Sequence, residues 1–175
     1  MNTYLISSTS YRLLQDEIIK IIKNSSNIIK FDYEEDSFEN ILEEASYFSL
    51  LDEKKYIIVY NANLFSSDKL NEEKSEILLK YFKEPNVNSV LIFTLYRPID
   101  SRKAVTKYIE KNGTIIVKDT PNEREMANII SSLLKKESFK ISYGGINYLI
   151  NNCRNDYDII LSEIEKIKIY LGEKN

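Results

Sequence analysis

The feature that most constrains the fold is a regular alternation, before residue 119, between short β-branched runs and longer amphipathic stretches. Apolar runs of about four to eight residues bounded by polar turns are typical of buried strands, whereas helical periodicity is typical of amphipathic helices. Strands that alternate with helices form βαβ units, so the sequence predicts an α/β fold with a five-stranded parallel sheet covered on both faces. The predicted strands are Thr3–Ser7, Asn27–Asp32, Tyr56–Tyr60, Val90–Leu95 and Thr114–Val117.

Four helices are expected between these strands, and several of their ends carry recognisable signals. Ser10 and Ser101 are candidate N-caps of the first and fourth helices. Asp36 with Glu39 three residues later matches a capping box for the second helix. Gly113 is expected to end the fourth helix as its C′ residue, where glycine commonly adopts the left-handed conformation. The predicted helices are 11–23, 37–45, 72–83 and 101–112.

The pattern changes near Asp119, after which no further strand is predicted. Thr120 followed by Pro121 is a typical helix start, with a capping threonine and a proline at the first helical position. We therefore expect two domains, residues 1–119 and 120–175, the second being a small domain of three helices. The predicted helices are Glu123–Lys136, Ser142–Asn152 and Asp156–Leu171.

The composition excludes several classes of chemistry. The chain has no histidine, which removes catalysis that depends on a Ser/His/Asp or Cys/His arrangement and metal sites that depend on imidazole. Its one cysteine, Cys153, is expected in the core, and a single cysteine is compatible with the reducing cytoplasm. The net charge of -3 gives no basic field for nucleic acid. No apolar run approaches a membrane span, and the N-terminus does not read as a signal peptide.

The strand ends, where α/β sheets bind ligands, lack the residues of a nucleotide hydrolase. The segment 7–12 after the first strand has neither the glycines nor the lysine of a phosphate-binding loop. The segment 60–63 after the third strand has no carboxylate to hold magnesium. Thr94 occupies the place of a phosphate sensor, but without a phosphate site it is better explained as a strand-end hydroxyl. No cofactor and no metal site are expected, and the domain is predicted to bind a macromolecule.

A small basic group, Arg97, Arg102 and Lys103, follows the fourth strand. We interpret it as a solvated loop and helix start, because isolated surface charges contribute little. The alternative is a contact with a neighbouring subunit or with DNA phosphate.

An apolar cluster, Tyr47–Leu51, lies between the second helix and the third strand. Four charged residues, Asp52–Lys55, follow it directly, so the chain is expected to surface there. The cluster either folds back into the core or remains exposed for a partner. The residues alone leave both alternatives open, although apolar residues are usually inside.

Four segments together resemble the δ subunit of bacterial DNA polymerase III, a subunit of the clamp loader. The longest is segment 45–59. It aligns without a gap with a run in the family that combines alanine, aromatic and basic residues. Segment 4–6, followed by a lysine-free loop, resembles the family's start, and Ser7 stands where the family often has glycine. Segment 99–103 resembles its D-x-R-K turn, and 158–170 resembles a helix with spaced Glu, Lys and Tyr.

The resemblance implies a RecA-like AAA+ domain without ATPase activity, followed by a small lid-like helical domain. In the family a helical collar domain then joins the subunit to its ATPase partners, and the resemblance implies that this domain is missing from this sequence, which ends at Asn175. The implied function is a non-catalytic clamp-loader subunit that binds and helps to open the sliding clamp during DNA replication. The implied partners are the clamp (beta subunit), the gamma and tau ATPase subunits, delta-prime and, indirectly, DNA; no membrane is involved. The implied clamp-binding residues are Phe48, Ser49, Leu50 and Leu51.

Two alternatives to this function remain. A divergent nucleotide hydrolase would bind and turn over ATP despite its missing motifs. A structural scaffold derived from an AAA+ domain would bury the cluster in its core instead of exposing it. Solvent exposure of the cluster therefore distinguishes the scaffold from a clamp-binding subunit.

Overall fold

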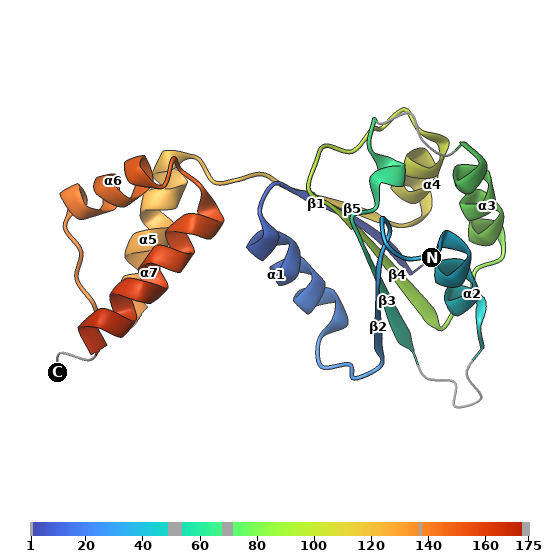
Figure 1. Cartoon of the computed structure of the whole chain (residues 1–175), viewed down its shortest axis with the longest axis horizontal. Helices are drawn as coiled ribbons and strands as arrows, with labels where there is room; N and C mark the ends of the chain where they lie inside the picture. Colours follow the sequence, from blue (N-terminus) through green and yellow to red (C-terminus); the bar gives the residue numbers. More distant parts are fainter. Residues whose placement is uncertain (1, 49–53, 68–71, 137, 173–175) are drawn as a thin grey trace. The chain divides into compact units, whose positions relative to one another are not determined.

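The computed structural model describes residues 2–48, 54–67, 72–136 and 138–172 (Figure 1). The chain divides into two compact units, Met1–Lys118 and Asp119–Asn175, which are considered separately below.

The first unit is built on a five-stranded sheet in the order β2-β3-β4-β1-β5. All four neighbouring pairs are parallel, which confirms the predicted α/β class and strand number. The central strand β4 is buried along its whole length, whereas the edge strands β2 and β5 are partly exposed. The strands are β1 (Thr3–Ser8), β2 (Ile28–Asp32), β3 (Lys55–Tyr60), β4 (Ser89–Leu95) and β5 (Thr114–Lys118).

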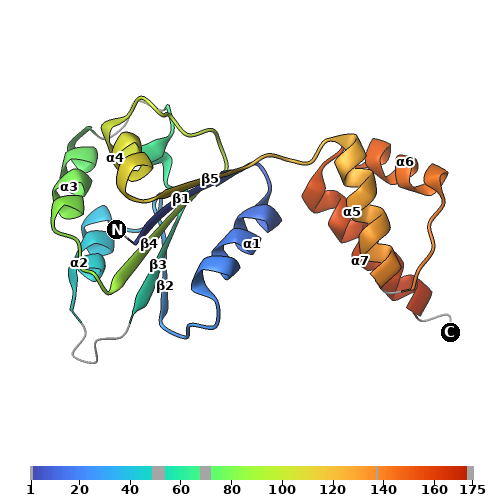
Figure 2. The same cartoon turned by 180° about the vertical axis from the view of Figure 1, so that it is seen from behind.

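Helices cover both faces of this sheet (Figure 1), and the view from behind shows the same division (Figure 2). One face carries α1 alone, and the other carries α2, α3 and α4. A short 3₁₀ helix, η1 (Asn63–Phe65), follows β3. The α-helices of this unit are α1 (Tyr11–Ile22), α2 (Phe38–Ser46), α3 (Glu72–Lys83) and α4 (Ala104–Asn112).

Alternate residues of each strand enter opposite sides of the core, because side chains alternate across a pleated sheet. In β1, Leu5 packs with the layer of α2, α3 and α4, and its neighbour Ile6 packs with the α1 layer. In β3, Ile57 and Ile58 divide in the same way. Both faces of the sheet are therefore apolar, which explains why its strands read as continuous hydrophobic runs.

In the first unit, two predicted N-caps prove wrong and one is confirmed. Ser10 caps α1 as expected, and its Oγ accepts a hydrogen bond from Leu13 N at 3.1 Å. Ser37, not Asp36, caps α2, because Asp36 Oδ2 instead accepts from Asp32 N in the turn that precedes the helix. The cap of α4 is Lys103, which makes no side-chain capping bond, rather than Ser101.

Gly113 ends α4, but not in the left-handed conformation expected of it. Its φ is -127°, which any residue adopts. A Cβ at this position would lie 2.6 Å from the carbonyl oxygen of Thr3. The glycine is thus required by the close approach of β1 rather than by backbone strain.

The second unit packs three helices around a separate apolar core. Asn122 and Glu125 exchange hydrogen bonds of 3.0 Å at the start of α5, the pattern of a capping box, so the cap lies two residues after the predicted Thr120. Cys153 is buried in this core, as predicted. The helices are α5 (Glu123–Lys136), α6 (Tyr143–Asn152) and α7 (Tyr157–Gly172). Across both units, each helix that the structure describes is too short or too polar to cross a lipid bilayer.

Candidate functional site

The C-terminal end of α2 is held by side chains from α3 and from the segment that leads into β4. A helix end leaves carbonyl groups without partners inside the helix. Ser89 Oγ and Tyr81 Oη donate to the carbonyl of Ala45, at 2.7 and 3.2 Å. Asn86 Nδ2 donates to the carbonyl of Tyr47 at 2.8 Å. The chain that leaves α2 is therefore fixed as far as Tyr47.

Lys55 binds the same helix end from the other side of the loop. The prediction that Lys55 is a surface charge is therefore wrong. It is the first residue of β3 and only 5% exposed. Its Nζ donates to the carbonyl of Glu44 and to Glu44 Oε1, the latter at 2.9 Å, and lies 5.2 Å from the centroid of the Tyr47 ring. A cation is favourable here because the carboxyl end of a helix carries partial negative charge.

Two aromatic side chains project from this fixed base. Tyr47 and Phe48 are 63% and 68% exposed. The exposure of Phe48 speaks against a cluster buried in the core, since apolar side chains of this size are usually inside. The other predicted clamp-binding residues, Ser49, Leu50 and Leu51, lie outside the described residues.

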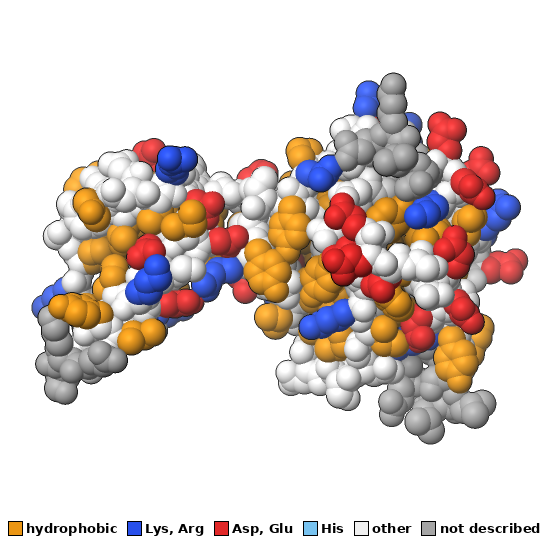
Figure 3. Space-filling view, viewed as in Figure 1, with side chains coloured by type: hydrophobic (Ala, Val, Ile, Leu, Met, Phe, Trp, Pro, Cys, Tyr) orange, Lys and Arg blue, Asp and Glu red, His pale blue; other side chains and the backbone are white. Residues whose placement is uncertain are grey.

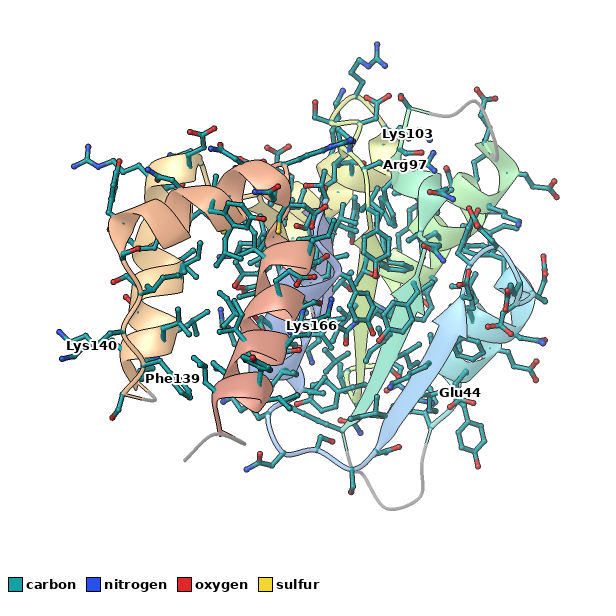
Figure 4. All side chains as sticks on the ribbon, turned by 60° about the vertical axis from the view of Figure 1, so that its left-hand side comes forward. Glu44, Arg97, Lys103, Phe139, Lys140 and Lys166 are labelled. Carbon is teal, nitrogen blue, oxygen red and sulfur yellow. The ribbon has the colours of Figure 1, made fainter. Side chains whose placement is uncertain are left out.

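A pocket of about 280 Å³ opens beside Tyr47. Glu44, at the end of α2, is labelled in Figure 4. The wall combines carboxylates, an amide and aromatic rings, so it can accept hydrogen bonds and can also stack. The lining residues are Phe31, Asn40, Glu43, Glu44 and Tyr47.

Hydroxyl groups at the end of β1 form hydrogen bonds within the protein. Ser8 Oγ accepts from Ser10 N at 3.1 Å, and Ser7 Oγ donates to the carbonyl of Arg97 at 2.8 Å. Thr94 is fully buried, with Oγ1 3.5 Å from the carbonyl oxygen of Val59, as expected of a strand-end hydroxyl. Each of these hydroxyls thus has a local structural role.

The carboxyl edge of the sheet does contain one carboxylate that the sequence analysis overlooked. Asp32, at the end of β2, accepts a 2.7 Å hydrogen bond from Asn61 Nδ2 at the end of β3. Both residues line a shallow pocket of about 330 Å³, beside Tyr11 and Tyr96, whose rings stack 6.3 Å apart. Among the described residues, no group of three or more acidic or cysteine side chains is placed to hold a metal ion.

The basic group after β4 is largely engaged within the domain. Arg102 donates to both carboxylate oxygens of Asp100, at 2.9 and 2.8 Å, and this hydrogen bonding holds the pKa of Asp100 well below its ordinary value. Lys103 Nζ donates to the carbonyl of Leu64 at 2.8 Å and so ties the start of α4 to η1; Figure 4 shows Lys103 near Arg97. These contacts favour the structural interpretation of the group.

The residues that hold the base of the candidate site were missed by sequence reasoning. Lys55 was predicted as one of four consecutive surface charges, and Asn86 and Ser89 lie between the predicted helix 72–83 and the predicted strand Val90–Leu95. The partner of Asn86 is 39 residues away in the sequence, that of Ser89 is 44 away and that of Lys55 is 11 away. No local sequence pattern predicts these contacts. The only signal in the sequence is the lack of a C-capping residue after Ser46, which requires that some other group satisfies the helix end.

Three comparisons with known proteins bear on this geometry. The family model for the delta subunit of DNA polymerase III matches residues 1–118. The DNA polymerase III subunit delta of Bacillus subtilis (strain 168) is 25% identical over 176 residues, which cover 98% of this chain and 50% of the relative. The chain therefore spans about half the length of that relative.

Solved structures support the same fold. The Bacillus subtilis DNA clamp loader delta protein (YqeN) superposes with a TM-score of 0.68 at 23% identity, covering 98% of this chain and 54% of that one. The RuvB Holliday junction branch migration motor of Thermotoga maritima gives 0.62 at 12% identity, with 98% and 56% covered. Domain III of the Thermotoga maritima replication initiation protein DnaA gives 0.53 at 16% identity, with 99% and 78% covered. These neighbours confirm the predicted RecA-like AAA+ fold.

Proposed function

The chain belongs to the family of DNA polymerase III delta subunits, and on that premise we propose that it is a non-catalytic clamp-loader subunit. It acts in the cytoplasm, where it binds the sliding clamp and helps to open it during DNA replication. Residues 1–119 form the clamp-binding AAA+ domain without ATPase motifs, and residues 120–175 form the lid-like domain.

The observation that carries this proposal is the exposed aromatic pair on a fixed base. Tyr47 and Phe48 present apolar surface to solvent at the end of a helix where the carbonyls of Glu44, Ala45 and Tyr47 accept side-chain hydrogen bonds. Residues that anchor protein interfaces are typically large apolar or aromatic side chains that fill a pocket on the partner. A fixed base lowers the entropy lost on binding, because fewer residues have to become ordered.

Leu50 and Leu51 are the anchors of the interface, and Phe48 and Ser49 lie beside them. The clamp offers an apolar pocket on its surface, and α2 lies against the clamp near its subunit interface. Contacts that form fully only with the opened ring shift the equilibrium towards it, since a ligand favours the state that it binds better. This role requires no chemistry from the chain itself.

The remaining partners belong to the longer assembly. The gamma and tau ATPase subunits and delta-prime supply nucleotide hydrolysis and the rest of the loader, and DNA is reached through the complex. Because this chain spans about half of its relative, we assign assembly with these partners to the longer protein.

Surface plasmon resonance with the sliding clamp of the same organism tests the proposal. We expect Phe48→Ala to weaken binding, because it removes exposed aromatic surface next to the anchors in the sequence. The double substitution Leu50→Ala with Leu51→Ala should weaken it as well, because each anchor contributes about 2 kcal/mol. That loss corresponds to roughly 30-fold in Kd for one anchor. Tyr143→Ala is the matched control, since Tyr143 is 76% exposed but lies on α6.

Circular dichroism would establish that each variant keeps its secondary structure. If the folded double variant binds the clamp as tightly as the wild-type chain, the proposed site is wrong. If the wild-type chain does not bind the clamp at all, the proposed function is wrong.

A further inference from the structure

We propose that the pocket beside Tyr47 receives a lysine or arginine side chain of the same protein partner that binds residues 48–51. This inference rests on the proposed function and adds to it the chemistry of a second contact. It assigns to Glu43 the role of recognising the partner's charge.

The pocket has a shape suited to an extended side chain. Its volume is about 280 Å³, and two rings, Phe31 from β2 and Tyr47 after α2, belong to its wall. The polar groups of α2, among them Asn40 and Glu43, line it as well, and both residues are exposed. An aliphatic stem can therefore lie against the rings while its charged end meets polar atoms, as lysine and arginine side chains commonly do.

The charge of the pocket favours a cation. Helix α2 carries three carboxylates and no basic residue, and its carboxyl end adds partial negative charge. Glu44 is already paired with Lys55. Glu43 is exposed and has no ion pair within the ranges that the structure describes, so its carboxylate is accessible to a cation of a partner. Figure 3 shows acidic side chains spread over α2 and α3 on the face in view.

The aromatic ring in the wall already contacts one cation. Lys55 Nζ lies 5.2 Å from the centroid of Tyr47, a distance typical of a cation–π interaction. Lys55 is buried and belongs to the base of the site, whereas the Tyr47 ring is 63% exposed. The exposed ring surface is free to make the same kind of contact with a cation from outside.

Other occupants fit less well. An apolar side chain would desolvate Glu43 and Asn40 without giving them hydrogen bonds, which costs free energy. A nucleic-acid phosphate would meet the carboxylates of α2 and be repelled by them. Tyr47 lines the pocket and directly precedes the exposed Phe48 in the sequence, so a protein bound at Phe48 is in reach of the pocket.

Binding of the sliding clamp at several salt concentrations tests the inference, with Glu43→Gln as the first variant. We expect the clamp Kd to rise about 2- to 5-fold at low salt, the range of exposed ion pairs, and the difference to shrink in about 0.5 M NaCl. Glu43→Lys reverses the charge and should raise Kd by about tenfold. Glu110→Gln and Glu110→Lys, at an exposed carboxylate on α4, should leave the Kd within a factor of about two.

The outcomes separate this inference from the function on which it rests. If Phe48→Ala weakens binding but Glu43→Gln and Glu43→Lys leave both the Kd and its salt dependence unchanged, the pocket does not receive a cation. If neither the Phe48 variant nor the variant at Leu50 and Leu51 weakens binding, the proposed site itself fails. Tighter binding by Glu43→Lys would point to an acidic partner group and would also overturn the inference.

Discussion

At the scale of single residues, Lys55 joins the two ends of the loop that carries the candidate site. Its ammonium is buried and bonded to both the carbonyl and the carboxylate of Glu44. We expect Lys55→Met to lower the free energy of unfolding by about 1–3 kcal/mol, because it removes the side-chain donor to the carbonyl and the carboxylate of Glu44. Urea unfolding followed by circular dichroism would measure the change.

The neighbouring lysine provides the control for this prediction. Lys54 is exposed, so Lys54→Met should change the free energy of unfolding by less than about 0.5 kcal/mol. Equal effects of the two substitutions would show that the contacts of Lys55 do not stabilise the fold.

The substitutions Gly113→Ala and Gly144→Ala are expected to change the stability of the chain in opposite directions. Gly113→Ala would place its Cβ against a backbone carbonyl and should destabilise the chain by about 1–3 kcal/mol. Gly144→Ala has only Ser142 Oγ nearby, at 3.9 Å, and lies inside α6, so it should stabilise the chain by about 0.4–1 kcal/mol. Urea midpoints of the two variants would check both signs, and a neutral Gly113→Ala would contradict the steric account.

Residue-scale predictions from sequence failed where several polar residues compete for one role. Asp36 and Ser37 are both good N-caps, and the choice depends on the turn that occupies Asp36. The burial of Lys55 depends on a helix end that lies next to it only in the folded chain. A local turn decides the first position and a tertiary contact decides the second, and propensity alone predicts neither.

At the scale of elements, a buried carboxylate links α1 to β5. Glu17 Oε1 lies 2.7 Å from Lys20 Nζ and 3.2 Å from Lys118 Nζ. The hydrogen bond from Lys20, with a further one from Lys118, lowers the pKa of Glu17 below its ordinary value of 4.5, although burial acts in the opposite direction. A lowered pKa means that the folded state favours the charged form.

This linkage makes the stability of the first unit dependent on pH. Charged Glu17 contributes to the free energy of unfolding above pH 4.5. This contribution is lost as the pH falls through the lower pKa that Glu17 has in the folded state. At pH 7, Glu17→Gln should reduce the free energy of unfolding by about 0.5–1.5 kcal/mol, and the difference should close in more acidic solution. Urea unfolding at pH 7 and about pH 3 would test this, with the exposed Asp16→Asn as control. A difference that grows towards low pH would contradict it.

Elements were predicted better than their caps, because periodicity is a property of many residues at once. Helices α3 and α5 begin and end at the predicted residues, and each strand is within one residue at either end. The alternation that predicted them is the same alternation that divides Leu5 from Ile6 between two core layers. The candidate site was predicted only in part: Phe48 is exposed, and the residues that fix its base were not foreseen.

At the scale of the whole molecule, the fold has the layout of a nucleotide hydrolase without its binding residues. Hydroxyls at the end of β1 form hydrogen bonds within the protein, and Asp32 accepts a hydrogen bond from Asn61. We expect a calorimetric titration with Mg-ATP to give no saturable heat, because phosphate binding requires a glycine-rich loop and its lysine. Saturable binding with ATP turnover would favour the divergent hydrolase instead.

Site-specific photo-crosslinking tests most directly whether the segment beginning at Phe48 contacts the sliding clamp. A photoreactive phenylalanine analogue at position 48 should crosslink to the clamp of the same organism. The same analogue at Tyr148, which is 68% exposed on α6, should not. Crosslinking from position 148 but not from position 48, with both proteins folded and bound to the clamp, would contradict the account.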